Sequence, residues 1–331
     1  MVGQSSAAER RAERLWAEGT ILLAERELRE RRIEATPDEA DAISRRAART
    51  RRWCAALDLE LGRVAAAARG SGLASPVLIK GPAVARHYPD PALRPYSDID
   101  LLVPEHELDR WIALLSGLGY VAPDRWDLDL QRRFTHHVKL RRPSGEGSVV
   151  CELHRFLFLE RRARRLDHAA LVPLSEPSRW DGVLWPRQPA LLVVLALHLA
   201  HHELERRRDI SVRDFVELGS PAVVAEARSI AERLEVGWAL ELALAEAERM
   251  VGEARWGAAP PAPTGLTAAG LLPRAGMRRT FAEARELGPV QGARYLAHLL
   301  SPRRFGSASE VAAYLRRQAR RARATNWLGR R

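Results

Sequence analysis

The sequence has few cysteines and no long apolar run, and both absences restrict the class of protein. Its two cysteines, Cys54 and Cys151, lie far apart and match no zinc or redox spacing, which suits a reducing compartment. The longest apolar stretch, at residues 190–200, is well short of the roughly 20 residues that cross a bilayer. The first residues carry charge where a signal peptide needs an apolar segment. We therefore expect a cytoplasmic protein without a membrane partner.

Lysine is also scarce. Of the 53 Lys and Arg residues, only Lys80 and Lys139 are lysines, so each of these compact ammonium groups is a candidate for a specific role. The formal net charge of +11 favours anionic partners such as nucleotides or RNA. Much of the surplus lies in runs typical of solvated helix faces, at residues 25–32 and in the tail from residue 314. The tail has no recognisable nucleic-acid-reading motif, and whether it binds nucleic acid stays open.

The pattern of apolar residues divides the chain into three regions. Residues 1–71 show helical spacing, with a new helix expected to start near Pro37. Residues 72–185 contain short β-type runs, two of which flank the turn-forming sequence PSGEG and indicate an antiparallel hairpin. Residues 186–331 are again helical, beginning with QPALLVVLALHLA. We predict an α+β protein whose small mixed or antiparallel sheet is flanked by N-terminal and C-terminal helical regions.

Two aspartates stand at the edge of the predicted strand at residues 98–103. Because side chains alternate along a strand, Asp98 and Asp100 point the same way, with roughly 7 Å between their α-carbons. Like charges held there repel each other and lose hydration, so a cation is expected between them. A divalent metal would meet that need. The alternative is that one aspartate caps the following turn or pairs with Arg94.

A third acid favours the metal. In VVCELHRF, Glu152 shares a strand face with His154, and pairing of neighbouring strands can bring Glu152 beside the two aspartates. Converging carboxylates make an oxygen-rich site for Mg²⁺, or for Mn²⁺ in its place. Two such ions activate an attacking hydroxyl and stabilise a leaving pyrophosphate. The three acids therefore indicate phosphoryl transfer.

The sequence LIKGPAVARHYPDPALRPYSDIDLLV, followed by CELHRF, resembles the nucleotidyltransferase superfamily of the DNA polymerase beta type. Within it, the chain is similar to a bacterial group of largely uncharacterised nucleotidyltransferases with a KG, R, DIDLLV and ELH signature. The resemblance covers residues 75–155 and, loosely, two later helices. It implies that Asp98 and Asp100 are metal ligands and that Glu152 is the third catalytic, metal-binding acid.

The expected nucleotide-binding residues are Lys80, Gly81 and Arg94. Many members of the superfamily carry Gly-Ser at the first turn, where this chain has Lys80 and Gly81. Gly81 would permit close backbone approach to a phosphate, and Lys80 could hold a phosphate oxygen as a mobile cation. Lys80 could instead be an ordinary strand-end lysine. Arg94 could clamp the triphosphate or orient an aspartate.

Other polar residues are candidates for lining the substrate cleft. Several alternatives stay open: a metal role or simple packing for the two helical histidines, and pairing of Asp214 with its neighbour Arg213. The cleft candidates are His137, Lys139, His154, His198, His202 and Asp214.

The expected activity is transfer of a nucleoside monophosphate from an NTP to a hydroxyl of an unidentified acceptor, with release of pyrophosphate. The acceptor is a small molecule or, alternatively, protein or RNA. The first rival is a catalytically inactive nucleotidyltransferase fold that binds nucleotide or RNA. The second is a scaffold whose arginine-rich helices bind nucleic acid.

Overall fold

The computed structural model describes residues 6–122, 128, 131–132, 136–145, 147–157, 166–200 and 209–257. The α-helices are α1 (Ala7–Ala17), α2 (Ile21–Arg29), α3 (Pro37–Arg69), α4 (Pro82–Ala85), α5 (Leu108–Gly117), α7 (His168–Leu171), α8 (Gln188–His198), α9 (Asp209–Leu218), α10 (Pro221–Arg233) and α11 (Gly237–Val251). The strands are β1 (Val77–Leu78), β2 (Ile99–Leu102), β3 (His137–Ser144), β4 (Gly147–His154), β5 (Ser175–Pro177) and β6 (Leu184–Pro186). Short 3₁₀ turns are η1 (Pro91–Leu93), η2 (Glu105–Glu107) and η4 (Val172–Leu174).

Within the described residues, six strands form one mixed sheet in the order β3-β4-β2-β1-β6-β5. The β3–β4 and β5–β6 pairs and β1–β2 are antiparallel, whereas β2–β4 and β1–β6 are parallel. The predicted α+β class, the mixed sheet and the hairpin are confirmed. The sequence analysis did not anticipate β5 and β6.

The flanking helices begin where the sequence indicates. Thr36 caps α3 through a capping box in which its side chain accepts from the backbone N–H of Glu39 and the Glu39 side chain accepts from that of Thr36. Pro37 occupies the first turn, where its missing N–H costs nothing. The apolar helix α8 likewise starts directly after Arg187.

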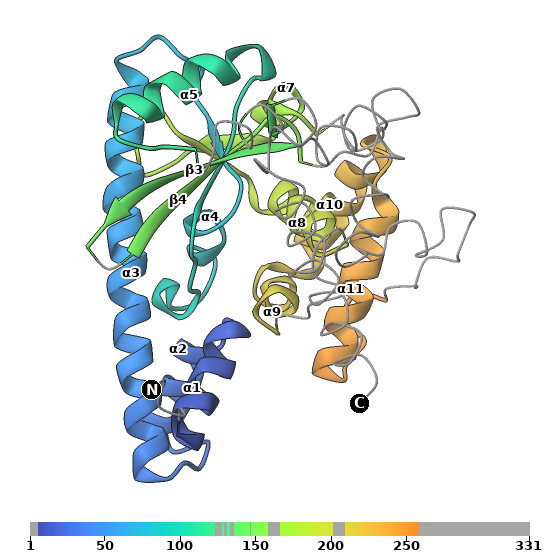
Figure 1. Ribbon diagram of the computed structural model, residues 1–331. Helices are drawn as coiled ribbons and strands as arrows, with labels where there is room; N and C mark the ends of the chain where they lie inside the picture. Colours follow the sequence, from blue (N-terminus) through green and yellow to red (C-terminus); the bar gives the residue numbers. More distant parts are fainter. Residues whose placement is uncertain are drawn as a thin grey trace, which may run out of the picture.

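One face of the sheet is apolar and covered by helices. Its strands contribute alternate residues, among them Ile99, Leu101 and Val103 of the β2 segment. These pack against the C-terminal half of α3, including Leu57 and Leu61, and against α5. Figure 1 shows α3 and α5 beside and above the strands, on the side away from α8 to α11. The alternation leaves Asp98 and Asp100 for the opposite face.

The opposite face adjoins the helical half. Val77, Ile79 and Leu102 pack into a second core cluster with the apolar residues of α8 to α11. The N-terminal half of α3 and the helices α1 and α2 join this second cluster. Helix α3 therefore contributes to both cores, and the predicted boundaries at residues 1–71, 72–185 and 186–331 stay a prediction.

A buried ion pair links the loop before β2 to the helical half. Arg94 donates to both carboxylate oxygens of Asp214 on α9, with Nε to Oδ1 and Nη2 to Oδ2 each at 2.7 Å. Tyr88 Oη donates to Asp214 Oδ1 at 2.7 Å. The Asp214 side chain is only 1% exposed. The alternative that Asp214 pairs with Arg213 is wrong, because Arg213 Nε donates to Glu217 Oε1 at 3.0 Å.

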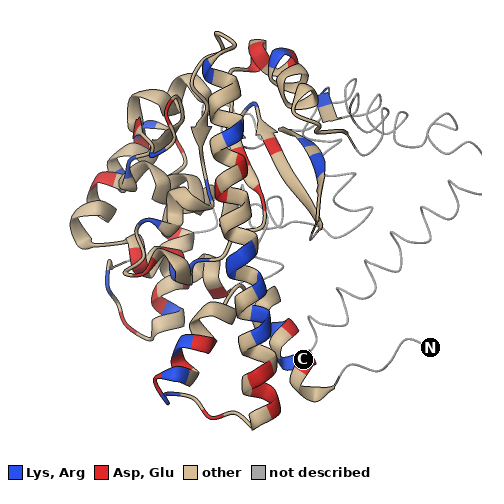
Figure 2. Ribbon diagram, turned by 90° about the vertical axis from the view of Figure 1, so that its left-hand side faces the viewer, with Lys and Arg blue, Asp and Glu red and all other residues tan. Residues whose placement is uncertain are grey.

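The charged helices carry both signs. Figure 2 shows basic and acidic residues interspersed along α3 and the neighbouring N-terminal helices. Some of these charges pair between helices, as in Arg46 with Glu13 at 3.1 Å and Arg11 with Glu39 at 2.9 Å. The run at residues 25–32 itself carries both signs, with pairs between Arg26 and Glu30 and between Arg29 and Glu25. The basic tail lies outside the described residues.

The described helices were also searched for a membrane span. None of them has both the length and the apolar character that crossing a bilayer requires.

The packing of α3 under the sheet predicts unequal roles for two leucines that lie two residues apart and therefore on opposite sides of the helix. Leu61 is 1% exposed and Leu59 is 79% exposed. We expect Leu61→Ala to lower the free energy of unfolding by about 2–5 kcal/mol and Leu59→Ala by less than about 0.5 kcal/mol. Urea unfolding of both variants measures this difference. Equal losses would contradict the assigned face of α3.

The buried pair between Arg94 and Asp214 predicts a large loss when one partner is removed. Asp214→Ala leaves a guanidinium without its carboxylate and should cost about 3–5 kcal/mol of unfolding free energy. Arg213→Ala removes a more exposed pair on the same helix and should cost less than about 1 kcal/mol. The double variant Arg94→Met, Asp214→Leu should regain part of the loss. A denaturation midpoint for Asp214→Ala equal to wild type would refute the linking role.

Candidate active site

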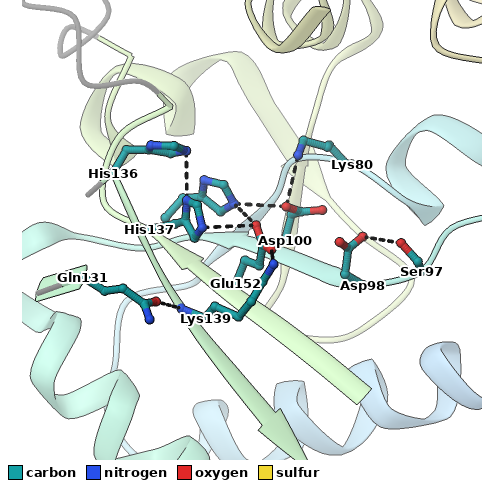
Figure 3. Close-up of polar contacts among 10 residues, drawn as sticks. Lys80, Ser97, Asp98, Asp100, Gln131, His136, His137, Lys139 and Glu152 are labelled. Carbon is teal, nitrogen blue, oxygen red and sulfur yellow. Dashed lines mark hydrogen bonds and ion pairs between the residues drawn. The ribbon is translucent and has the colours of Figure 1, made fainter. Parts of the chain in front are cut away.

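Strand register brings the acids together. The parallel pairing of β2 with β4 sets Asp100 directly beside Glu152, and β3 pairs with β4 so that Lys139 lies on the other side of Glu152. The backbone of Asp100 is also held by β1, since its carbonyl accepts from the N–H of Ile79 at 3.1 Å. Figure 3 shows Asp98, Asp100, Glu152, Lys80 and Lys139 gathered over one face of the strands.

Both lysines of the chain contact these acids. Lys80 Nζ lies 3.2 Å from Asp100 Oδ1, and Lys139 Nζ lies 2.5 Å from Glu152 Oε1. His154 adds a third contact, with Nε2 3.0 Å from Asp100 Oδ1 and 3.6 Å from Glu152 Oε2. Asp100, Glu152 and His154 are all buried. Each of the two lysines thus has a specific carboxylate partner on this face of the sheet.

The charges perturb one another strongly. Burial opposes ionisation of Asp100, but the ammonium of Lys80 and the hydrogen bond with His154 lower its pKa to about 2. Burial also opposes ionisation of Glu152, yet His154 and Lys139 hold its pKa well below the usual range. For Lys80, burial is outweighed by the carboxylates, which raise its pKa. These groups therefore form a network of full charges.

Asp98 is the least compensated of the three acids. It precedes β2 by one residue, and its Oδ1 accepts from Ser97 Oγ at 3.3 Å. Burial and the negative charge of Asp100 raise the pKa of Asp98 to about 6. A carboxylate whose ionised form is disfavoured by its surroundings is one that a cation would stabilise.

The turn after β1 positions Lys80. Gly81 follows it with φ of +58°, in the region that favours glycine, and α4 begins at Pro82. A β-carbon at Gly81 would meet the ring of Tyr96 at 3.5 Å. The glycine thus lets the chain reverse closely beside the strand that carries the aspartates.

Histidines extend the network along β3. His137 Nε2 lies 3.8 Å from Glu152 Oε2, and His137 Nδ1 lies 2.9 Å from His136 Nε2. Burial lowers the pKa of His137 to about 3, so the ring is neutral. The sequence predicts His137, Lys139 and His154 as candidates for the substrate cleft but does not single out His136. Strand alternation would put the side chain of His136 on the face opposite that of His137. His136 joins the cluster because it lies in the bend that precedes β3.

The remaining predicted site residues lie in different surroundings. Arg94 pairs with Asp214, which is not one of the three predicted metal-binding acids. Its two expected roles, clamping the triphosphate and orienting an aspartate of the site, stay predictions. His198 is half-buried at the end of α8. His202 lies outside the described residues. Their roles, like that of Asp214 in substrate binding, stay predictions.

The donor set fits a divalent cation. Asp100, Glu152 and His154 each offer one ligand atom, and these atoms lie within 4.8 Å of one another. Asp98 adds a carboxylate whose raised pKa marks it as undercompensated. Carboxylate oxygens are the ligands that Mg²⁺ prefers, and a nitrogen ligand is tolerated better by Mn²⁺.

Comparison with known proteins identifies the family of the chain. A search of curated proteins found no match. A family model described as uncharacterised nucleotidyltransferase matches residues 9–252, which include the whole sheet and the described helices from within α1 to the end of α11. The chain belongs to this family of uncharacterised nucleotidyltransferases.

Proposed function

We propose that the protein is a Mg²⁺-dependent nucleotidyltransferase that moves a nucleoside monophosphate from an NTP to a hydroxyl of an acceptor. The observation that carries the proposal is the β2–β4 register, which sets Asp100 beside Glu152 with Asp98 two residues away. Family membership supports the same reaction class. Mn²⁺ is the alternative metal.

Asp98, Asp100 and Glu152 are the proposed metal ligands. A bound divalent cation would polarise the phosphoryl group and offset the charge of the leaving pyrophosphate. Burial opposes ionisation of Glu152, but His154 and Lys139 keep it ionised, so we assign it the role of metal ligand and, as the resemblance implies, of acceptor for the hydroxyl proton. His154 orients Asp100 through their 3.0 Å contact.

Lys80 and Gly81 are the proposed nucleotide-binding residues. The Lys80 ammonium can exchange its contact with Asp100 for a phosphate oxygen, because its flexible stem allows the head group to move. Gly81 allows the backbone to approach the phosphates. Arg94 supports the segment that leads into Asp98 through its pair with Asp214.

In the proposed reaction the acceptor hydroxyl oxygen bonds to the α-phosphorus of the NTP. The bond from that phosphorus to the oxygen that bridges to the β-phosphate breaks, pyrophosphate leaves with the electron pair, and the hydroxyl proton passes to the Glu152 carboxylate and then to water. Lys139 and His137 lie next to Glu152 and are proposed to contact the acceptor. We favour a small-molecule acceptor, with protein or RNA as the alternative.

The acids predict loss of turnover without loss of fold. Asp100→Asn and Glu152→Gln should each lower the rate by at least about a thousandfold, because each removes a charged ligand from the site. The control is Asp109→Asn, an acid whose side chain is 70% exposed on α5. The measurement is mass spectrometry of candidate acceptors incubated with mixed NTPs and Mg²⁺, since the added mass identifies the transferred group.

Undiminished turnover in the folded Asp100→Asn variant would overturn the assignment. A wild-type protein that binds NTP but modifies no acceptor and releases no pyrophosphate would favour the inactive binding fold. Salt-sensitive RNA binding that survives loss of both aspartates would favour the scaffold.

Lys80 predicts a separate effect on nucleotide affinity. Lys80→Ala removes the ammonium group that contacts Asp100 and should weaken NTP binding about tenfold, which corresponds to roughly 1.4 kcal/mol. Arg69→Ala, which removes an exposed cation paired with Asp181, is the control and should bind NTP as wild type does. Titration with a fluorescent NTP measures both. Unchanged affinity in Lys80→Ala would reduce this lysine to a structural counter-ion.

A further inference from the structure

Three imidazoles meet beside the carboxylates. His137 on β3 is paired in register with His154 on β4, and His136 directly precedes His137. The ring centroids lie 4.4 Å apart for His136 and His137, 5.6 Å for His136 and His154, and 5.1 Å for His137 and His154. Each ring offers a nitrogen, and the three nitrogens lie within 4.8 Å of one another.

We propose that His136, His137 and His154 form a binding site for a borderline transition metal ion such as Zn²⁺ or Co²⁺, next to the carboxylates and with His154 common to both groups. The proposal does not depend on nucleotidyl transfer. It assigns the imidazole cluster a ligand of a different chemical class from Mg²⁺, because neutral imidazole nitrogens suit zinc and cobalt whereas magnesium prefers oxygen.

The spacing of the nitrogens is close to that of a metal site. Two nitrogens bound to one tetrahedral zinc at about 2.0–2.1 Å lie about 3.3 Å apart. The observed separation of His137 Nδ1 and His136 Nε2 is 2.9 Å, so these rings need only a small adjustment to share an ion. Three protein ligands leave a fourth position for water or another group, as in catalytic zinc sites.

The hydrogen bonding of His154 supports the same conclusion. Metal-bound histidines usually direct their second ring nitrogen to a carboxylate, which fixes the ring orientation. His154 Nε2 lies 3.0 Å from Asp100 Oδ1. Its other nitrogen, Nδ1, is buried and has no hydrogen-bond partner within the described ranges. A metal ion would provide that partner in a place where an unpaired polar atom is costly.

The imidazole cluster directly adjoins the carboxylates. His137 Nε2 lies 3.8 Å from Glu152 Oε2, and His154 touches both Asp100 and Glu152. A dication held by the three rings would therefore add positive charge next to Glu152. It would also join the start of β3 to the end of β4.

The test is a cobalt titration of the untagged full-length chain after metal removal with a chelator. Excess Mg²⁺ is present throughout to occupy the carboxylates. We expect one equivalent of Co²⁺ to give the intense visible absorption of a low-coordinate, nitrogen-bound ion, and Zn²⁺ to displace it. His136→Ala should weaken Co²⁺ binding by at least about 100-fold. The controls His106→Ala, at an exposed position on η2, and Asp98→Asn should bind Co²⁺ as wild type does.

Three results would overturn the proposal: no cobalt spectrum in the wild-type chain under excess Mg²⁺, a spectrum lost in Asp98→Asn, or a His136→Ala variant with wild-type affinity. Circular dichroism checks that each variant is folded. If His136→Ala does not fold, His136→Gln keeps a polar side chain of similar length and gives the same comparison. Because the readout is metal binding, failure here leaves the proposed transfer reaction untouched, and an inactive enzyme leaves this site untouched.

Discussion

The crowding of three carboxylates on one buried face is the constraint on which the rest of the structure depends. Asp98, Asp100 and Glu152 repel one another where water screens them poorly. The only two lysines of the chain offset this repulsion: Lys80 contacts Asp100, and Lys139 contacts Glu152. An ammonium on a flexible stem can leave when another cation or a phosphate arrives, whereas a bidentate guanidinium is held more rigidly.

The pleat of β2 makes this crowding compatible with a stable core. Ile99 and Leu101 face α3 and α5 while Asp100, between them, faces the other way. A slip of one residue in the β2–β4 register would put leucine at the site and an aspartate in the core. The apolar packing of α3 against the sheet thus fixes the positions of the charged groups on its far side.

Much of the site could be predicted from the sequence because strand alternation is a local rule. It places Asp98 and Asp100 on one face, and the parallel pairing of β2 with β4, which alternation alone does not give, sets Glu152 beside Asp100. Long-range partners could not be predicted this way: the partner of Asp214 is Arg94, far away in the chain, and not the adjacent Arg213. The strands β5 and β6 escaped notice because both end in proline, which argues against a strand.

Helix α3 limits which fragments of the chain can fold by themselves. With 33 residues it is about 50 Å long, and it lends one half to each apolar cluster. A fragment starting at residue 72, just before the first strand, would lack Leu57, Leu61 and Val64 and would expose the leucine-rich underside of the sheet to water. All the predicted site motifs between residues 80 and 154 lie after residue 72, yet a fragment that starts there would lack the helix that covers the apolar face of their sheet.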